Sequence, residues 1–234
     1  MALQIWDKLL PDQPNNNLYF KGKDYFRTLY DMIVSTGGLK SSTEEFKLVL
    51  SDKVSIEDMA SNPVQLRFLE LMVRLTNAKR IIEIGAFIGL SAMTMARAMP
   101  AGGKLTTIEK FDHFAEICKK NFAANGVADR IDILQGDAFE VIESLPKDDL
   151  FDIAFIDGNK ERYAHYFEVL EPRVRSGGLI MVDDVLFHGD ALNTKFETEK
   201  GEGAKAFLDV AASRKNYPRL VLPICNGIML LQKP

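Results

Sequence analysis

From residue 80 onward, short apolar runs alternate with longer segments in which apolar residues recur every three or four positions. The apolar runs predict strands at 80–85, 104–109, 131–136, 151–157 and 178–183. The segments between them predict helices at 89–98, 113–125, 138–145 and 160–170. Apolar strands that alternate with helices are typical of a parallel sheet that is covered on both faces. The pattern therefore predicts an α/β fold with a mostly parallel sheet.

The pattern changes near the C-terminus, where two apolar runs at 219–224 and 228–232 flank Cys225-Asn226-Gly227. Asn-Gly between two apolar runs is a strong hairpin signal. These runs raise the predicted number of strands to seven. The sheet is therefore predicted to finish with an antiparallel strand.

Residues 1–78 contain no convincing strand and are predicted to form an N-terminal helical cap before a core of residues 79–234. Ser42-Thr43 followed by two glutamates resembles a helix start. Pro63 is a favourable first residue for a second helix. The apolar residues of that helix recur at helical spacing: Leu66, Leu69, Met72, Val73 and Leu75. A length of 234 residues fits one domain, so cap and core are predicted to form a single unit.

The composition argues against several classes of protein. A formal net charge of −4 and a pI near 5.5 argue against nucleic acid as a partner, because nucleic-acid binders usually carry a basic domain. The two cysteines, Cys118 and Cys225, form no CxxC pair, which favours a reducing compartment over a zinc site or disulfides. The sequence shows neither a signal-peptide pattern nor a membrane-spanning apolar run. We therefore expect a cytoplasmic protein with no membrane partner.

Carboxylates follow two of the predicted strands directly. Asp157 ends the run that begins at Phe151, and Asp183-Asp184 ends the run that begins at Gly178. Neighbouring carboxylates repel one another unless a cation or a proton offsets their charge. An all-oxygen cluster suits a hard divalent ion. The sequence therefore predicts that these three aspartates bind Mg²⁺, with Ca²⁺ or Mn²⁺ as alternatives.

Lys160 lies three residues after Asp157 and places a potential base beside that ion. The structural alternative is that Lys160 only pairs with Asp157 along a helix. Asp184 has a similar alternative as a helix cap or a solvated acid.

Gly85 and Gly89 form a turn between the first predicted strand and the following helix. Gly85 would let a ligand approach the backbone closely, and Gly89 eases the entry into the helix. The spacing is neither the G-x-G-x-x-G fingerprint nor a phosphate loop, which makes a nicotinamide dehydrogenase a poor interpretation. Glu109, at the end of the next strand, can accept hydrogen bonds from both ribose hydroxyls. Together these features predict a nucleoside ligand without a pyrophosphate; a bare turn and a solvated acid are the alternatives.

Four motifs then occur in order at the spacing of a known family: Glu83–Ser91, Gln135–Ala138, Phe155–Lys160 and Gly177–Gly189. With them, the chain from about Met59 to its end resembles the class I S-adenosylmethionine-dependent, cation-dependent O-methyltransferases. This family includes catechol and caffeoyl-CoA O-methyltransferases. The resemblance implies a Rossmann-like seven-stranded sheet, S-adenosylmethionine (SAM) as cofactor, a divalent cation and a homodimer.

The resemblance also implies roles for residues that match family positions. The cofactor-binding positions are Ser61, Glu83, Gly85, Ala86, Ser91, Glu109, Asp137, Ala138 and Asp157. The metal ligands are Asp157, Asp183 and Asp184, and the catalytic residues are Lys160 and Asp157. The substrate positions are Met59, Lys160 and His188, although Met59 also fits a core methionine and His188 a plain loop residue.

The activity implied by the resemblance is transfer of a methyl group from SAM to a hydroxyl of a small aromatic, catechol-like substrate (a vicinal diphenol), with assistance from a divalent metal. One alternative is a methyltransferase of the same fold that acts on a hydroxylated uridine in tRNA, against which the acidic pI weighs. Another is a cofactor-binding protein that has lost catalysis. This second alternative is motivated by Asp184, Asn159 and Phe187, which depart from the usual family residues Asn, Asp and Trp.

Overall fold

The computed structural model describes residues 30–52 and 61–234 of the chain, which divides into two compact units, 1–39 and 40–234. In the first unit, residues 30–36 are helical, and the amide of Gly37 donates to the carbonyl of Ile33 at the end of this helix. The second unit contains the sheet and is described by itself below. The division into a cap of residues 1–78 and a core of residues 79–234 within one domain stays a prediction.

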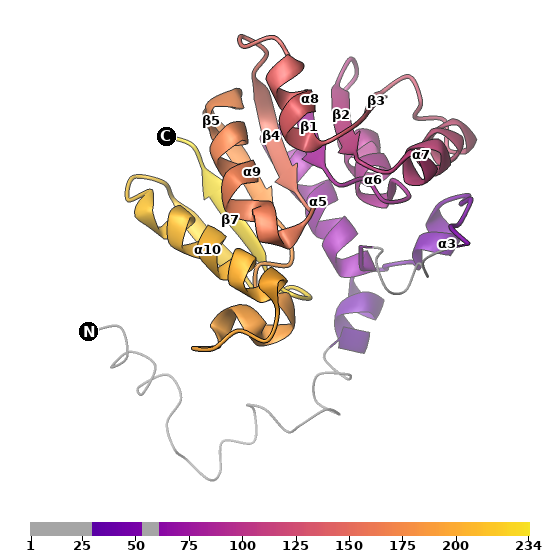
Figure 1. Cartoon of the computed structure of the whole chain (residues 1–234). Helices are drawn as coiled ribbons and strands as arrows, with labels where there is room; N and C mark the ends of the chain where they lie inside the picture. Colours follow the sequence, from indigo (N-terminus) through magenta and orange to yellow (C-terminus); the bar gives the residue numbers. More distant parts are fainter. Residues whose placement is uncertain (1–29, 53–60) are drawn as a thin grey trace. The chain divides into compact units, whose positions relative to one another are not determined.

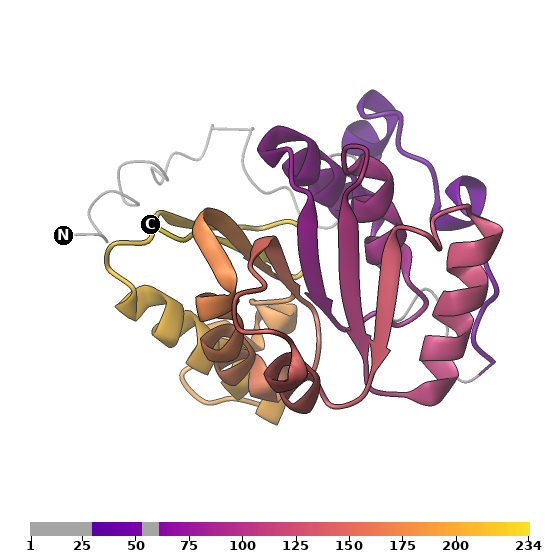
Figure 2. The same ribbon diagram turned by 90° about the horizontal axis from the view of Figure 1, so that it is seen from above.

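Seven strands form one sheet in the order β3-β2-β1-β4-β5-β7-β6 (Figures 1 and 2). The strands are β1 (Arg80–Ile84), β2 (Lys104–Glu109), β3 (Ile131–Gln135), β4 (Phe151–Ile156), β5 (Val174–Val182), β6 (Arg219–Leu222) and β7 (Ile228–Gln232). Strand β7 is antiparallel to both of its neighbours, and the remaining neighbouring strands are parallel. This confirms the predicted Rossmann-like α/β sheet with a final antiparallel strand.

The predicted hairpin joins β6 to β7, but its loop is longer than a two-residue Asn-Gly turn. Leu222 pairs with Ile228, so five residues, 223–227, connect the two strands. The left-handed positions are Cys225 (φ 52°) and Gly227 (φ 87°), and Asn226 is not one of them. The loop is longer because it also pairs with the segment after β5. The amide of Leu186 donates to Asn226 O, and the amide of Val185 donates to Gly227 O.

Helices cover both faces of the sheet (Figure 2). The helices packed on one face are α5 (Pro63–Thr76), α6 (Leu90–Ala98) and α7 (Asp112–Ala124). Those on the other face are α8 (Ala138–Ser144), α9 (Tyr163–Leu170) and α10 (Glu199–Ser213). Side chains alternate along each strand, so that Ile81 joins the core on the first face and Ile82 the core on the second.

Short elements connect the main ones. They are α3 (Ser42–Glu45) and the 3-10 helices η1 (Lys160–Arg162), η2 (Glu171–Arg173) and η3 (Phe187–Leu192). The predicted helix start at Ser42 is confirmed, with Ser41 as its N-cap. Among the described residues, no helix has the length and apolar character needed to cross a membrane.

Helix α5 begins at Pro63, as predicted, after the N-cap residue Asn62. Leu66, Leu69 and Val73 are buried and form the stripe that faces the core. Leu75 was expected on the same stripe, but it is 76% exposed. It lies two positions after Val73, which rotates its side chain away from the face that the other three share.

The parallel register brings the carboxyl ends of the central strands to one edge of the sheet. Ile84 of β1 pairs with Ile108 of β2 and Ile156 of β4, and Ile156 pairs with Val182 of β5. The residues that follow these positions are therefore neighbours: Gly85, Glu109, Asp157 and Asp183. The chain order reverses between β1 and β4, which is where ligands bind in open α/β sheets.

Candidate active site

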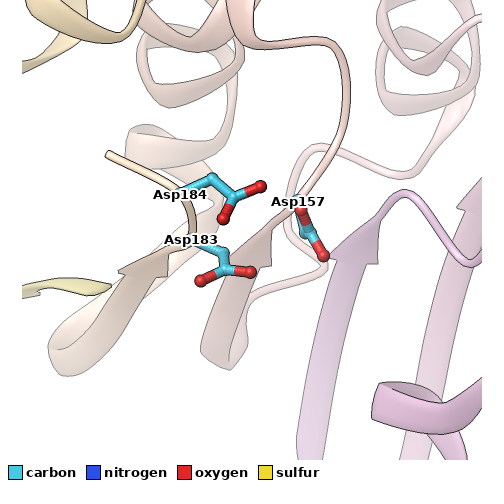
Figure 3. A group of neighbouring side chains, drawn as sticks. All are labelled: Asp157, Asp183 and Asp184. Atoms are coloured by element: carbon cyan, nitrogen blue, oxygen red, sulfur yellow. The ribbon is translucent and has the colours of Figure 1, made fainter. Parts of the chain in front are cut away.

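Three carboxylates meet at the ends of β4 and β5. One oxygen from each of Asp157, Asp183 and Asp184 lies within 4.8 Å of the others. Figure 3 shows the three side chains around a common space, with Asp157 at the end of β4 and with Asp183 and Asp184 at the end of the neighbouring strand β5. The amide of Asp157 donates to Ile84 O and that of Asp183 to Ile156 O, so the sheet ladder itself fixes their backbone positions. The structure thus brings together the three residues predicted to bind a metal.

Lys160 joins this cluster from η1. Its Nζ lies 3.0 Å from Asp157 Oδ1 and 3.1 Å from Asp184 Oδ2, and its side chain is 15% exposed. Pairing with Asp157 is therefore confirmed, but Lys160 also bridges to a second strand end. Burial of the ammonium lowers the pKa of Lys160, yet the carboxylates of Asp157 and Asp184 outweigh this effect and hold the pKa above its ordinary value.

The chemistry of this cluster fits a divalent cation. Three carboxylates and one ammonium leave a formal charge of −2, which a divalent ion would neutralise. Asp183 is 4% exposed, and its Oδ1 is buried without a hydrogen-bond partner among the described residues. A buried acceptor without a partner is costly, and a bound cation would remove that cost.

The same charge density acts on the carboxyl groups. Burial and the nearby Asp184 raise the pKa of Asp157, although Lys160 opposes the shift. Burial and repulsion from Asp157 and Asp184 raise the pKa of Asp183 well above its usual range. Both shifts have the direction expected for carboxylates that repel one another at close range, and a bound cation would oppose them.

Glu83 is a fully buried acid on β1, close to the carboxyl end of the strand. Ser91 Oγ and Thr107 Oγ1 each donate to its carboxylate at 2.5 Å. Burial raises the pKa of Glu83 to about 7, and the hydroxyl hydrogen bonds oppose the shift. No cationic side chain is paired with Glu83 in the described part of the chain. The site therefore contains a carboxylate that a cationic ligand group would stabilise.

The glycine turn after β1 is shaped by its protein neighbours. Gly85 has φ 95°, and a Cβ there would lie 2.8 Å from the carbonyl carbon of Asp157. Gly89 has φ 87°, and a Cβ there would press on the ring of Phe122. Both glycines are thus needed for backbone and core packing, in addition to any ligand contact.

Glu109 closes this turn from the end of β2. Its Oε2 accepts hydrogen bonds from the amides of Ala86 (3.2 Å) and Phe87 (3.0 Å). Its Oε1 accepts a third hydrogen bond from Phe111 N at 2.9 Å. The residue is 6% exposed, so the solvated-acid interpretation is wrong.

Asp137 and Ala138 lie at the start of α8. Asp137 caps this helix by accepting from Phe139 N, and Ala138 is its buried first residue. The Asp137 carboxylate also accepts from Arg162 Nη1 at 2.8 Å. Burial raises the pKa of Asp137, but the hydrogen bonds from Arg162 and Phe139 N outweigh this and hold it below its ordinary value.

The remaining predicted positions are Ser61, Met59 and His188, and of these Ser61 and His188 lie outside the carboxylate cluster and the glycine turn. Ser61 is half-buried immediately before α5, and Met59 lies outside the described residues. His188 is exposed, and its ring lies 5.1 Å from the ring of Phe187. Phe187 and His188 are both left-handed (φ 39° and 55°), a conformation that is uncommon outside glycine and marks this loop as one held by its surroundings.

Sequence reasoning missed one residue of the cluster. The Nε2 of Gln65, on α5, donates a hydrogen bond to Asp183 Oδ2. Gln65 is 3% exposed. A buried glutamine on the core face of an amphipathic helix is unusual, and that was the available signal.

Comparisons with known proteins identify the family to which this chain is similar. A family model described as O-methyltransferase matches residues 39–234. A probable caffeoyl-CoA O-methyltransferase of Dictyostelium discoideum is 31% identical over 193 residues, which cover 80% of this chain and 84% of the relative. The catechol O-methyltransferase of Niastella koreensis is 34% identical over 148 residues, which cover 62% of this chain and 67% of the relative.

A solved structure is similar over most of its length. The O-methyltransferase TomG of Streptomyces achromogenes, in complex with SAM, is 29% identical to this chain and superposes with a TM-score of 0.71. The alignment covers 90% of this chain and 95% of TomG.

The seven-stranded sheet, with its chain order reversing between β1 and β4, defines a protein of the Rossmann-like α/β class. The chain belongs to the O-methyltransferase family and is a SAM-dependent O-methyltransferase.

Proposed function

We propose that this enzyme transfers the methyl group of SAM to a hydroxyl of a small, catechol-like vicinal diphenol with the help of a divalent cation. The observation that carries the proposal is the carboxylate cluster, in which a buried Asp183 oxygen has no hydrogen-bond partner among the residues that the structure describes. The names of the Niastella koreensis and Dictyostelium discoideum relatives support an aromatic hydroxyl substrate. Mg²⁺ is the proposed ion because the three protein ligands are all carboxylates.

Asp157, Asp183 and Asp184 would hold the cation, which would supply Lewis-acid stabilisation of the substrate oxygen. Lys160 Nζ is within 3.1 Å of two of these ligands and is the proposed acceptor of the hydroxyl proton. In the metal-free site, Asp157 and Asp184 keep Lys160 protonated. Lys160 can accept a proton only when these two carboxylates no longer stabilise its ammonium form as strongly.

The cofactor is proposed to lie across the carboxyl ends of β1, β2 and β3. Glu83 would face the cationic amino acid end of SAM, and Glu109 the ribose. The positions beside them are Ser61, Gly85, Ala86, Ser91, Asp137, Ala138 and Asp157, and His188 and Met59 would contact the substrate. Hydroxyl hydrogen bonds from Ser91 and Thr107 hold the Glu83 carboxylate in place, which preorganises it for a cation.

Replacing Glu83 with glutamine tests its role through stability and binding. A folded-state pKa of about 7 against 4.5 means that the folded chain keeps a proton that the unfolded chain has lost. Stability due to this group is therefore present below pH 4.5 and falls as pH rises to 7, by up to about 3 kcal/mol. We expect Glu83→Gln to reduce the loss of unfolding free energy between pH 5 and pH 8, and to weaken SAM binding by about tenfold.

Denaturant unfolding at the two pH values and calorimetric titration with SAM measure both effects. Thr107→Val is a companion variant: it keeps the ionisable group and removes one hydrogen bond that opposes the upward pKa shift of Glu83, so the pH dependence should persist. An unchanged pH dependence together with unchanged SAM affinity in Glu83→Gln would remove the residue from the cofactor site.

The reaction is tested with caffeic acid, SAM and Mg²⁺, with and without EDTA. We expect turnover that EDTA abolishes and that excess Mg²⁺ restores. A parallel calorimetric titration with SAM shows whether the cofactor site is intact in the same sample. SAM binding without turnover on any catechol–metal combination would contradict the proposed substrate, and turnover that resists EDTA would contradict the proposed metal.

We further propose a homodimer and a cytoplasmic location, both of which rest on the family resemblance and on the composition. Light scattering coupled to size-exclusion chromatography measures the first, and cell fractionation the second. A monomer at micromolar concentration would contradict the proposed assembly.

A further inference from the structure

Gln65 reaches the carboxylate cluster from α5 and contacts a different carboxylate from those that Lys160 contacts. Lys160 contacts Asp157 and Asp184, whereas Gln65 contacts the third carboxylate, Asp183. We propose that Gln65 is a positioning residue that determines which oxygen of Asp183 is presented to the cation. This inference rests on the proposed metal-assisted function.

The orientation of the Gln65 amide is fixed by the start of its own helix. Gln65 Oε1 accepts a hydrogen bond from Asn62 N at 3.4 Å, and Asn62 Oδ1 accepts from Val64 N at 2.9 Å. This reciprocal arrangement is a capping box, with Gln65 at its third position. Because Oε1 is committed to Asn62, the amide turns its N–H toward Asp183.

The hydrogen bond from Gln65 makes the two oxygens of Asp183 unequal. Oδ2 accepts from Gln65, and Oδ1 is buried without a partner in the described part of the chain. Asp183 is 4% exposed and Gln65 is 3% exposed, so water cannot readily take over either role. An outer partner of this kind holds a metal ligand in one orientation and leaves the free oxygen to bind the ion.

A carboxamide suits this position better than a carboxylate. Glutamate has the same length and keeps the acceptor for Asn62 N, but it has no N–H to donate. It would also place a fourth acid against a cluster that already has three acids and one lysine. Gln65→Glu therefore removes the donor while preserving size and capping, and Gln65→Met removes donor and acceptor while preserving length.

Binding of Mn²⁺ to the full chain tests the inference without relying on catalysis. The signal of free Mn²⁺ in electron paramagnetic resonance gives the dissociation constant, with S-adenosylhomocysteine present at saturation. We expect Gln65→Met and Gln65→Glu each to raise this constant by about 10- to 100-fold. Calorimetric affinity for S-adenosylhomocysteine is expected to stay at the wild-type value, because it reports on the cofactor site and on folding.

Asn62→Ala is the matched control for the helix start. It removes the side-chain cap on Val64 N and keeps the backbone N–H that orients Gln65. We expect this variant to keep the wild-type affinity for Mn²⁺. An equal loss in Asn62→Ala and Gln65→Met would show that the effect arises from α5 as a whole and would overturn the assignment of Gln65.

The remaining outcomes separate this inference from the function on which it rests. Wild-type affinity in Gln65→Met would overturn the positioning role and leave the metal site standing. Tighter Mn²⁺ binding in Gln65→Glu would mean that residue 65 reaches the ion directly, which also overturns it. Failure of the wild-type protein to bind Mn²⁺ would instead overturn the proposed metal site. If Gln65→Met does not fold, the comparison of Gln65→Glu with wild type decides the question.

Discussion

Replacing Asp157 with alanine is expected to abolish methyl transfer while leaving the affinity for SAM nearly unchanged. The Asp157 carboxylate is shared between Lys160 and the cluster of metal ligands. Its loss removes one proposed metal ligand and one of the two carboxylate partners of Lys160. Losing several kcal/mol of metal assistance would lower the rate by about 10³-fold or more. The Asp157 backbone, which lies against Gly85, is unaffected by the substitution. Initial rates of S-adenosylhomocysteine formation measure the first effect and calorimetric titration with SAM the second.

Asp132→Ala is a suitable control because Asp132 is an exposed carboxylate on the edge strand β3. It changes the net charge by the same amount without touching the cluster, so its rate should match the wild type. An unchanged rate in Asp157→Ala would remove Asp157 from the metal site. A parallel loss of SAM affinity would show that its side chain supports the cofactor as well.

The strands and the acidic cluster were predictable from sequence for the same reason. Buried parallel strands read as continuous apolar runs, so their ends are visible where acids interrupt them. Phe151–Ile156 ends in Asp157, and the run up to Val182 ends in Asp183. Parallel pairing then places both ends at one edge of the sheet, without any knowledge of side-chain packing.

Helix α10 was not predicted, because its sequence contains glycines that close packing requires but that disfavour a helix. Gly201 and Gly203 lower the helix propensity of the segment. A Cβ at Gly203 would lie 2.5 Å from Glu161 Cα and from Lys160 O, and one at Gly201 would overlap the Asp190 carboxylate. Gly203 therefore allows α10 to pack closely against the backbone that carries Lys160, and Gly201 leaves room for the Asp190 carboxylate. Such a requirement is visible only in three dimensions.

Gln65 was missed for a related reason. Its contact with Asp183 joins residues 118 positions apart, and its hydrophobic neighbours on α5 gave the segment the pattern of an ordinary amphipathic helix. The second partner of Lys160 was missed in the same way, because only the pairing with Asp157 is local in sequence. Sequence spacing can predict contacts within one helical turn or between neighbouring strand ends. The contacts of Gln65 with Asp183 and of Lys160 with Asp184 join separate elements, so spacing does not predict them.

Replacing Lys160 with alanine is expected to lower turnover by about 10²- to 10⁴-fold, the usual contribution of a positioned acid–base group. Metal binding should change far less. Without the ammonium, the three carboxylates lose the one positive partner that they have in the described part of the chain. The metal-free site becomes more repulsive, and its attraction for a cation does not fall. Rates at saturating Mg²⁺ and Mn²⁺ titration by electron paramagnetic resonance separate the two effects.

Lys160→Arg distinguishes a proton acceptor from a counter-charge. Arginine keeps the positive charge and can donate to Asp157 and Asp184, but its guanidinium does not give up a proton in proteins. If Lys160 accepts the hydroxyl proton, Lys160→Arg loses turnover as severely as Lys160→Ala while its metal affinity stays close to wild type. Recovery of turnover in Lys160→Arg would instead assign Lys160 to charge neutralisation. Equal losses of turnover and metal affinity in Lys160→Ala would make the lysine structural, since removing a base alone has no reason to release the ion.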